Sequence, residues 1–205
     1  MADAGRVIAG SARSIRLATP GGVTRPLGDR VKQTMFAILE PDLPGARFLD
    51  LFAGSGAAGI EALSRGAAEA VFVERDAGAA RTIEANLRAT RLAGERAGVA
   101  RREVGAYLAD PRVPGSPATI AFVDPPYAEP ELLLAALRAL GDPLGRVLSP
   151  GARVVAKHSS RTSLPARIGL LASERNRRFG ETALAFYRRT DPDRPPEPDS
   201  SEEDA

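Results

Sequence analysis

The segment DLFAGSGAAG, from Asp50 to Gly59, has the residue types that hold a nucleotide-like ligand. Gly54, Gly56 and Gly59 form the pattern Gly-x-Gly-x-x-Gly directly after an apolar run. Such glycines permit a tight turn, a close approach of the backbone to a ligand, and close packing of a helix on a strand. The carboxylate of Asp50 favours a ligand with a cationic or amine group over a bare pyrophosphate. The alternative interpretation is a tight turn that binds nothing.

A second carboxylate, Glu74, stands at the end of another apolar run, 20 residues after Gly54. A carboxylate at this place can accept hydrogen bonds from both ribose hydroxyls of an adenosine-containing cofactor. Alternatively, Glu74 and Asp76 are acidic residues that interact favourably with the dipole of a following helix. A nicotinamide dinucleotide stays open as a ligand on these two motifs, because its ribose makes the same contact.

The tetrapeptide Asp124-Pro125-Pro126-Tyr127 follows a third apolar run. Its two prolines fix the backbone and remove two N–H donors. The carbonyl of Asp124 or Pro125, together with the Asp124 carboxylate, can then accept hydrogen bonds from a substrate amine. The ring of Tyr127 offers a flat face on which a base can stack. The motif therefore predicts a site for a planar base with an exocyclic NH2 group, and the alternative is a rigid turn.

These three motifs lie at the ends of apolar runs that alternate with helical patterns. Strands are predicted at residues 46–52, 70–74, 99–104, 119–123 and 153–157, and helices at residues 57–65, from Asp76 onward, and at residues 131–140. The alternation indicates an α/β fold with a mostly parallel, twisted sheet and helices on both faces. Ligands of such sheets bind beyond the carboxyl ends of the strands, near the point where the strand order reverses. We therefore expect all three motifs at that end of the sheet.

The two ends of the chain differ from this central region. Residues 6–10 and 15–19 predict a short β-hairpin, and a helix is predicted over residues 29–40. Residues 166–171 and 183–188 predict a late antiparallel hairpin. The last residues are rich in proline, serine and acid and offer no apolar anchor, so we expect disorder there. The predicted divisions are an N-terminal extension with a hairpin and a helix at 1–44, a main α/β domain at 45–190 and a disordered acidic tail at 191–205.

The composition of the 205-residue chain argues against several kinds of site. The chain has no cysteine and one histidine, His158, which excludes a disulfide scaffold or thiolate nucleophile and disfavours a metal site or a Ser-His-Asp triad. It has no apolar run of about 18 residues, the length that spans a membrane, and its start lacks the apolar core of a secretory signal. We expect a cytoplasmic, monomeric protein without metal.

The charge of the chain is unevenly distributed. Lysine and arginine number 28 against 26 aspartates and glutamates, a net charge of +2. Residues 191–205 hold seven carboxylates and one arginine, so the rest of the chain carries a net charge of +8. A basic body favours an anionic partner, with nucleic acid first, and a solvated arginine-rich surface is the alternative.

The motifs FAGSGAAG and FVDPPY resemble those of S-adenosylmethionine-dependent methyltransferases that act on exocyclic amines of nucleic-acid bases. Further segments narrow the resemblance: RVIAG from Arg6, TRPLGDRVK from Thr24, GIEALSRG from Gly59, FVERD from Phe72 and FGET from Phe179. In this order they are similar to the bacterial 16S ribosomal RNA guanine-N2 methyltransferase family, over about residues 5–190.

The resemblance implies a Rossmann-like class I methyltransferase fold, with S-adenosylmethionine as cofactor. It implies methyl transfer to a guanine N2 of 16S rRNA, either naked or in a small-subunit assembly intermediate. The catalytic residues that it implies are Asp124, Pro125, Pro126 and Tyr127. The cofactor residues that it implies are Asp50, Phe52, Ala53, Gly54, Ser55, Gly56, Gly59, Glu74, Arg75, Gly105 and Ala106. RNA phosphate contacts are expected at Arg6, Arg13, Arg16, Arg25, Arg30 and Lys32.

The sequence departs from the family pattern in three places. Leu27-Gly28 and Gln33 replace two hydroxyl residues and a glutamate, Gly105-Ala106 replaces an aspartate or asparagine, and Lys157-His158 stands where an acidic residue is common. Three other functions stay open: a DNA or RNA adenine-N6 methyltransferase, a nicotinamide-dependent oxidoreductase, and a non-catalytic RNA-binding protein. The proline motif disfavours the oxidoreductase, and the intact glycine motif disfavours the non-catalytic protein.

Overall fold

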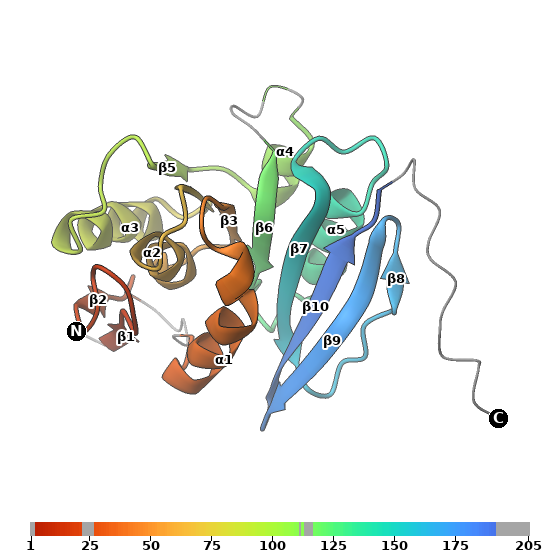
Figure 1. The fold of residues 1–205 in the computed structure, drawn as a ribbon, viewed down its shortest axis with the longest axis horizontal. Coiled ribbons are helices and arrows are strands. Elements are labelled where there is room, and N and C mark those ends of the chain that lie inside the picture. Colours follow the sequence, from red (N-terminus) through yellow and green to blue (C-terminus); the bar gives the residue numbers. More distant parts are fainter. Residues whose placement is uncertain (1–2, 22–26, 111, 113–116, 192–205) are drawn as a thin grey trace.

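A computed structural model of the chain describes residues 3–21, 27–110, 112 and 117–191, which form a large sheet with helices and a small N-terminal hairpin (Figure 1). The hairpin consists of β1 (Asp3–Arg6) and β2 (Arg16–Ala18). The sheet consists of β3 (Arg47–Leu51), β4 (Glu69–Val73), β5 (Ala97–Ala100), β6 (Ala118–Val123), β7 (Leu148–Ser159), β8 (Arg167–Ile168), β9 (Leu171–Phe179) and β10 (Thr182–Arg189). The helices are α1 (Asp29–Leu39), the short 3-10 helix η1 (Glu40–Asp42), α2 (Ala57–Ser64), α3 (Ala77–Ala89), α4 (Val104–Leu108) and α5 (Pro130–Leu140).

The described strands of the large sheet follow the order β5-β4-β3-β6-β7-β10-β9-β8. The strands from β5 to β7 run parallel, and β10 lies antiparallel between β7 and β9. From β3 the chain proceeds outward through β4 to β5 and then returns to the other side of β3 as β6. The strand order therefore reverses between β3 and β6, and ligands of such sheets bind at the carboxyl ends of these strands. The mostly parallel α/β fold predicted from the sequence is confirmed.

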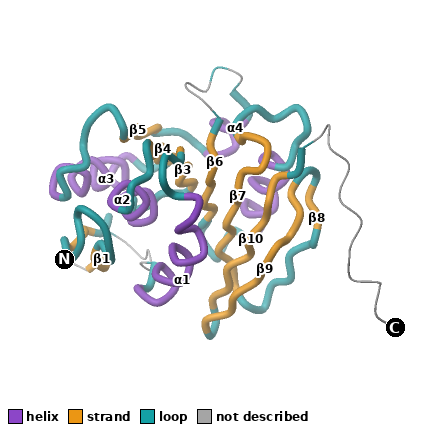
Figure 2. Tube along the Cα trace, in the orientation of Figure 1, coloured by secondary structure: helices purple, strands orange, loops and turns teal. Residues whose placement is uncertain are grey.

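Side chains of the central strands alternate between two hydrophobic cores, one on each face of the sheet. Phe48, Phe72 and Phe122 contribute to the first core, with residues of α1, α2 and α3. Leu49 and Val123 contribute to the second, with residues of α4 and α5. In Figure 2, α1, α2 and α3 lie in front of the sheet and α5 lies behind it. This burial on both faces explains why β3 and β6 read as continuous apolar runs in the sequence.

Buried polar groups of α2 and α3 hold the N-terminal hairpin in place. The Glu61 carboxylate of α2 accepts hydrogen bonds from the backbone N–H groups of Ile8 (2.8 Å) and Ala9 (3.0 Å). Asn86 of α3 accepts a hydrogen bond from the Ala18 N–H (2.8 Å) and donates to the carbonyls of Ala18 and Ser55 (2.9 Å each). The described part of the N-terminal extension is therefore attached both to the main sheet region and, through Asn86, to the glycine-rich turn.

Three predicted strands differ from those in the structure, and the first is the strand at 6–10, since β1 covers Asp3–Arg6 instead. The predicted strand at 99–104 ends at Ala100, and α4 follows it, with Val104 and Tyr107 packed into the second core. The predicted strand at 166–171 is wrong, because β8 covers only two residues there. The late antiparallel hairpin does exist, but β9 is its first strand. Residues 174–178 of β9 are all exposed and polar, so the strand carries no apolar alternation that sequence reasoning could detect.

Candidate active site at the carboxyl end of the sheet

The glycine-rich turn joins β3 to α2 in a conformation that few other residues adopt. Gly54 and Gly56 have φ values of +55° and +76°, in the left-handed region that favours glycine. A Cβ atom on Gly59 would lie 2.3 Å from the Phe72 ring, so the absence of a side chain lets α2 pack closely on β4. Phe52 also has a positive φ, +61°, and such strained backbone in a residue other than glycine clusters at ligand sites.

Asp50 lies at the end of β3 beneath this turn and is buried. Its Oδ2 accepts a hydrogen bond from the Gly59 N–H at 2.9 Å, which ties the strand to the start of α2. Burial raises the pKa of Asp50 to about 8, the Gly59 N–H opposes this shift, and the charges of Asp124 and Glu74 add to it. A cation bound nearby would favour the ionised form of Asp50. The site therefore suits a positively charged ligand.

Glu74 lies at the end of β4 and contacts the same turn. Its Oε2 accepts a hydrogen bond from the Gly54 N–H at 2.9 Å, and its Oε1 accepts one from the Asp76 N–H at 2.8 Å. Asp76 in turn caps α3 by accepting a hydrogen bond from the Ala79 N–H at 2.8 Å. Each oxygen of a carboxylate has a second lone pair, so Glu74 can still accept hydrogen bonds from ribose hydroxyls. That contact stays a prediction. Arg75 is exposed and forms ion pairs with Glu103 (3.5 Å) and Glu129 (3.3 Å).

The proline turn follows β6, the strand next to β3. The Asp124 carboxylate accepts hydrogen bonds from Nζ of Lys157 at 2.6 and 2.9 Å, one to each oxygen. Burial raises the pKa of Asp124, and the ammonium of Lys157 opposes that shift. Lys157 Nζ also lies 4.9 Å from the centroid of the Tyr127 ring, a cation–π contact. Tyr127 is 43% exposed, and its hydroxyl is 3.0 Å from Oγ1 of Thr182 on β10.

Two cavities flank the proline turn. The smaller, about 60 Å³, is lined by Asp50, Phe52, Ala53, Ser55 and Asp124, and the N-terminal residues Thr19, Pro20 and Leu27 close it on another side. The larger, about 240 Å³, is lined by Pro125, Pro126, Tyr127, Lys157 and His158, with residues of α5. The turn therefore separates a cavity that it shares with the glycine turn, with Asp50 and Asp124 in the lining, from a more apolar cavity beside the tyrosine.

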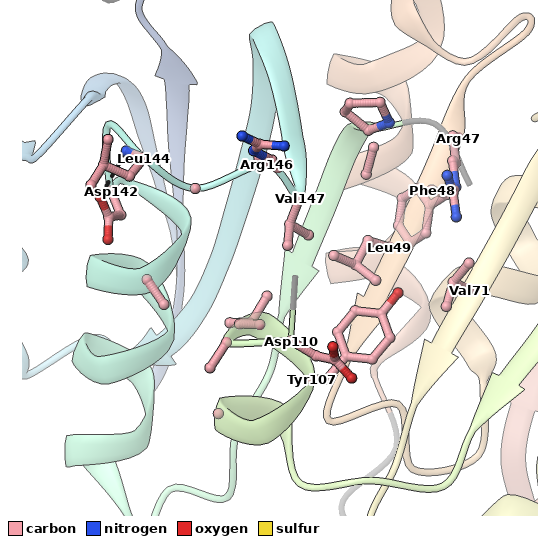
Figure 3. A pocket seen from close by; sticks show the side chains of 17 residues that line it. Arg47, Phe48, Leu49, Val71, Tyr107, Asp110, Asp142, Leu144, Arg146 and Val147 are labelled. Carbon is pink, nitrogen blue, oxygen red and sulfur yellow. Dashed lines mark hydrogen bonds between the residues drawn. The ribbon is translucent and has the colours of Figure 1, made fainter. Parts of the chain in front are cut away.

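A cavity of about 360 Å³ lies at the opposite end of the sheet (Figure 3). Its walls come from the start of β3, from α4 and from the segment after α5, and Figure 3 shows Arg47, Tyr107 and Asp142 among them. Gly105 lines this cavity and not the one beside Asp50, and the carbonyl of Ala106 accepts a hydrogen bond from Arg102 at 3.2 Å. The predicted contacts of Gly105 and Ala106 with a cofactor stay predictions.

The prediction that Lys32 contacts RNA phosphates is wrong. Its side chain is fully buried, its Nζ donates a hydrogen bond to the Arg6 carbonyl, and it lies 3.5 Å from Oε2 of Glu61. Because the ammonium is enclosed by these acceptors, it cannot reach a phosphate outside the protein. Arg6 is partly exposed and lies 3.5 Å from Asp29.

Of the other arginines predicted to contact RNA, three lie within the described residues and one does not. Arg13, Arg16 and Arg30 are exposed, and Arg25 lies outside the described residues. Their contacts with RNA stay predictions.

Sequence reasoning assigned no role to Lys157, which the structure brings to the centre of the site. β6 and β7 are parallel neighbours, and Val123 pairs with Ala156, so Asp124 and Lys157 follow at the same level of the sheet. A signal did exist, since Lys157 is one of only two lysines and lies at the end of a predicted strand. The sequence signal at Lys157 points to the site only when the strand order shows that β6 and β7 are neighbours.

Among the described residues, no helix is long and apolar enough to cross a membrane. Within the same part of the chain, no group of three or more histidine, aspartate or glutamate side chains is arranged to hold a metal ion.

Comparison with known proteins places the chain in a family. Residues 5–188 match the model of the family described as "Conserved hypothetical protein 95". The chain belongs to this family. It is 39% identical to the putative rRNA methyltransferase YlbH of Bacillus subtilis, covering 90% of this chain and 98% of that relative. It is 36% identical to ribosomal RNA small subunit methyltransferase D of Escherichia coli, covering 90% of this chain and 89% of that relative.

Solved structures of similar proteins have the same fold. The putative methyltransferase yhhF of Escherichia coli is 33% identical, with a TM-score of 0.79 over 90% of this chain and 97% of that chain. An RNA methyltransferase of Salinibacter ruber, solved in complex with S-adenosyl-L-homocysteine, has a TM-score of 0.60 over 85% of this chain and 98% of that chain. At 18% identity, the second likeness concerns the fold alone. The class I methyltransferase fold expected from the sequence is confirmed.

Proposed function

We propose that the chain is an S-adenosylmethionine-dependent methyltransferase that modifies the exocyclic N2 of a guanine in small-subunit ribosomal RNA. One observation carries the proposal: Asp50 of the glycine turn and Asp124 of the proline turn line the same cavity. A cofactor held at the first turn would thus lie beside an amine held at the second. The names of the two curated relatives support ribosomal RNA as the substrate, and that of the Escherichia coli relative supports the small subunit. Guanine N2 rests on the resemblance found in the sequence.

The glycine turn and the carboxylates beside it would bind the cofactor. Its adenosine would lie near Glu74, whose carboxylate has lone pairs left for ribose hydroxyls. A sulfonium cation bound beside Asp50 would favour the ionised form of this buried carboxyl, whose pKa is otherwise raised to about 8. When bound, S-adenosylmethionine supplies an activated methyl group, so the protein needs little acid–base power. The cavity of about 60 Å³ is smaller than a nucleoside, so most of the cofactor would lie along the open edge of the sheet.

The proline turn would orient the target amine. The N2 nitrogen of guanine is a poor nucleophile because its lone pair is shared with the ring. The Asp124 carboxylate and the Pro125 carbonyl can accept hydrogen bonds from both N2 hydrogens and so hold the nitrogen for attack, within about 3–3.5 Å of the methyl carbon. Lys157 would favour the ionised form of Asp124 against the effect of burial and fix the direction of its carboxylate, since it donates to both oxygens. Asp124 therefore acts as an acceptor, and the proton of the product leaves to Asp124 or to water.

Tyr127 would stabilise a base that has left its stack. A base inside a folded RNA cannot reach the cavity beside Asp124, and extruding it costs a few kcal/mol. The exposed ring of Tyr127 offers a stacking surface that offsets part of that cost. The hydrogen bond to Thr182 and the cation–π contact with Lys157 hold the ring in place.

The test is methylation of purified small-subunit RNA and of small subunits with methyl-labelled S-adenosylmethionine, followed by digestion to nucleosides. We expect the label in N2-methylguanosine. Label in N6-methyladenosine would assign the protein to the adenine-modifying enzymes. Binding of RNA and cofactor without any labelled nucleoside would support the non-catalytic RNA-binding alternative.

A further inference from the structure

Three arginines lie close together near the end of β9. Arg175, Arg177 and Arg178 are all exposed, and in the described part of the chain none of them forms an ion pair. Arg177 donates one hydrogen bond, to the carbonyl of its neighbour Asn176 at 3.2 Å. We call these three residues the β9 arginines. Three cationic side chains within four residues leave an uncompensated positive charge on this strand.

Two arginines on the neighbouring strands, unlike the β9 arginines, form ion pairs. Arg153 of β7 and Arg188 of β10 both contact Glu174, at 3.3 and 2.6 Å. Glu174 is thereby neutralised by the strands beside it and does not compensate the β9 arginines. Two basic residues of the N-terminal extension are likewise paired with carboxylates, since Lys32 is buried against Glu61 and Arg6 lies against Asp29. The charge of the β9 arginines is thus available to an external anion.

The β9 arginines lie at the same end of the sheet as the candidate active site. Thr182, the first residue of β10, pairs with Phe179 of β9 and with Ser159, the last residue of β7. In Figure 1 the turn between β9 and β10 lies at the end of the sheet toward which β6 points. The hydroxyl contact between Tyr127 and Thr182 connects that turn directly to the proline motif.

The strand register places Arg177 in one row with Lys157. Arg177 pairs with Leu184, and Leu184 pairs with Lys157, so the three side chains belong to the same face of the sheet. Adjacent strands lie about 4.8 Å apart, which puts the backbones of Arg177 and Lys157 about 10 Å from each other. Arg175 pairs with Phe186 on that face, and Arg178 pairs with Ala183 on the other. The cationic groups thus flank the approach to Asp124 and Tyr127.

We propose that the β9 arginines bind the phosphate backbone of the substrate RNA and so bring the target base to Tyr127. The proposal rests on the proposed function and adds a docking surface to it. Phosphate contacts fix the position and direction of a nucleic acid without reading its sequence, which suits a surface beside the reacting base. Guanidinium groups bind phosphate through two parallel hydrogen bonds, and exposed arginines without carboxylate partners are free to make them.

A different explanation is protection of a sheet edge. The register gives β8 two partners on β9, Leu171 and Ala172, so the stretch that carries the arginines is an edge in the described sheet. Charged side chains on an edge strand prevent pairing with a second molecule. The two explanations differ in what is lost when the charges are removed: RNA affinity in one case and the monomeric state in the other.

The test compares two variants with equal loss of charge. The first combines Arg175→Gln, Arg177→Gln and Arg178→Gln. The control combines Arg88→Gln, Arg96→Gln and Arg138→Gln, which are exposed residues away from the proline turn. Binding of a small-subunit rRNA transcript is measured over a series of salt concentrations, together with the KM and kcat of its methylation.

We expect the first variant to lower the slope of log affinity against log salt by about 2–3, since each phosphate contact contributes about 0.7–0.9. The KM for RNA should rise while kcat and the affinity for S-adenosylhomocysteine stay near the wild-type values. The control variant should keep most of the slope. Substitution of the same three residues by lysine, which keeps the charge, should restore it.

Failure of this surface can be told apart from failure of the proposed function. If the wild-type protein methylates RNA and the first variant has the salt slope and KM of the control, the docking surface is overturned. The same conclusion follows if the first variant binds RNA normally but forms larger assemblies in gel filtration, because the arginines then protect the edge. If the wild-type protein transfers no methyl group to RNA, the proposed function itself has failed.

Discussion

The two ends of the parallel sheet carry very different cavities. The cavity at the amino end is about 360 Å³ and is lined by the starts of strands and by α4, whereas the cavity shared by Asp50 and Asp124 is about 60 Å³. The smaller one has the glycine turn, the proline turn and the reversal of strand order, and the larger one has none of these. Volume therefore does not identify the site in this protein. The site is identified instead by the strand ends that the chain topology brings together.

Loss of the Asp124 carboxylate should show the largest difference in activity between changes at the carboxyl end and changes at the amino end of the sheet. Asp124→Ala removes the acceptor that orients the target amine, and we expect single-turnover methylation to fall about 100–1,000-fold, as for removal of one preorganised electrostatic contact. Affinity for S-adenosylmethionine should change little, because the glycine turn and Glu74 hold the cofactor. Asp142→Ala is the matched control, since it removes an exposed carboxylate from the amino-end cavity. Full activity of folded Asp124→Ala would remove this residue from the mechanism.

Tyr127 should matter through its ring. Tyr127→Ala removes a stacking surface worth about 1–3 kcal/mol, so we expect kcat/KM for RNA to fall between about 5-fold and 150-fold. Tyr127→Phe loses the contact with Thr182 but keeps the ring, and it should retain most of the activity. Steady-state kinetics on the same RNA distinguishes the two variants. Equal losses in both would mean that the hydroxyl contact, and not stacking, is what the reaction needs.

The buried carboxyl of Asp50 should make stability depend on pH. Its pKa is about 8 in the folded protein against an ordinary value of 3.8, so between these values the folded state binds more protons than the unfolded state. The contribution of this group to the free energy of unfolding therefore decreases as the pH rises from about 4 to about 8. Asp50→Asn keeps an oxygen that can accept the Gly59 hydrogen bond but does not titrate.

We expect urea unfolding at pH 5 and pH 8 to show a smaller loss of stability in Asp50→Asn than in the wild-type protein. Asp142→Asn, at the exposed amino-end position, should follow the wild-type dependence. If the curves of Asp50→Asn and the wild-type protein run parallel, Asp50 is ionised in the folded protein throughout this range.

Local signals predicted the parts of the site that lie at the ends of buried strands. Gly54, Gly56 and Gly59 constrain the backbone directly, and the two prolines do the same after β6, so these turns are encoded within a few residues. Lys32 could not be predicted in the same way, because its burial depends on Glu61, which reaches it from a different helix. A basic residue in a basic segment has the sequence signature of an RNA contact whether or not it is buried.

Interactions between strands account for most of what sequence reasoning missed. The Asp124–Lys157 ion pair depends on β6 and β7 being adjacent and in register, which the sequence does not specify locally. The exposed residues of β9 form a strand because β10 pairs with them, not because of their own pattern. In both cases the functional hypothesis came from the sheet order, which only the structure supplied.

The central claim is that S-adenosylmethionine binds at the carboxyl end of the sheet and not in the larger cavity at the amino end. Calorimetric titration of S-adenosylmethionine into Glu74→Ala and Ala139→Trp tests it directly, since Ala139 is an exposed residue of α5 that lines the amino-end cavity. Losing a charged acceptor costs about 1.5–3 kcal/mol, so we expect affinity about 10–150-fold weaker in folded Glu74→Ala. Ala139→Trp should bind as the wild-type protein does. Unchanged affinity in Glu74→Ala together with weakened affinity in Ala139→Trp would contradict the claim.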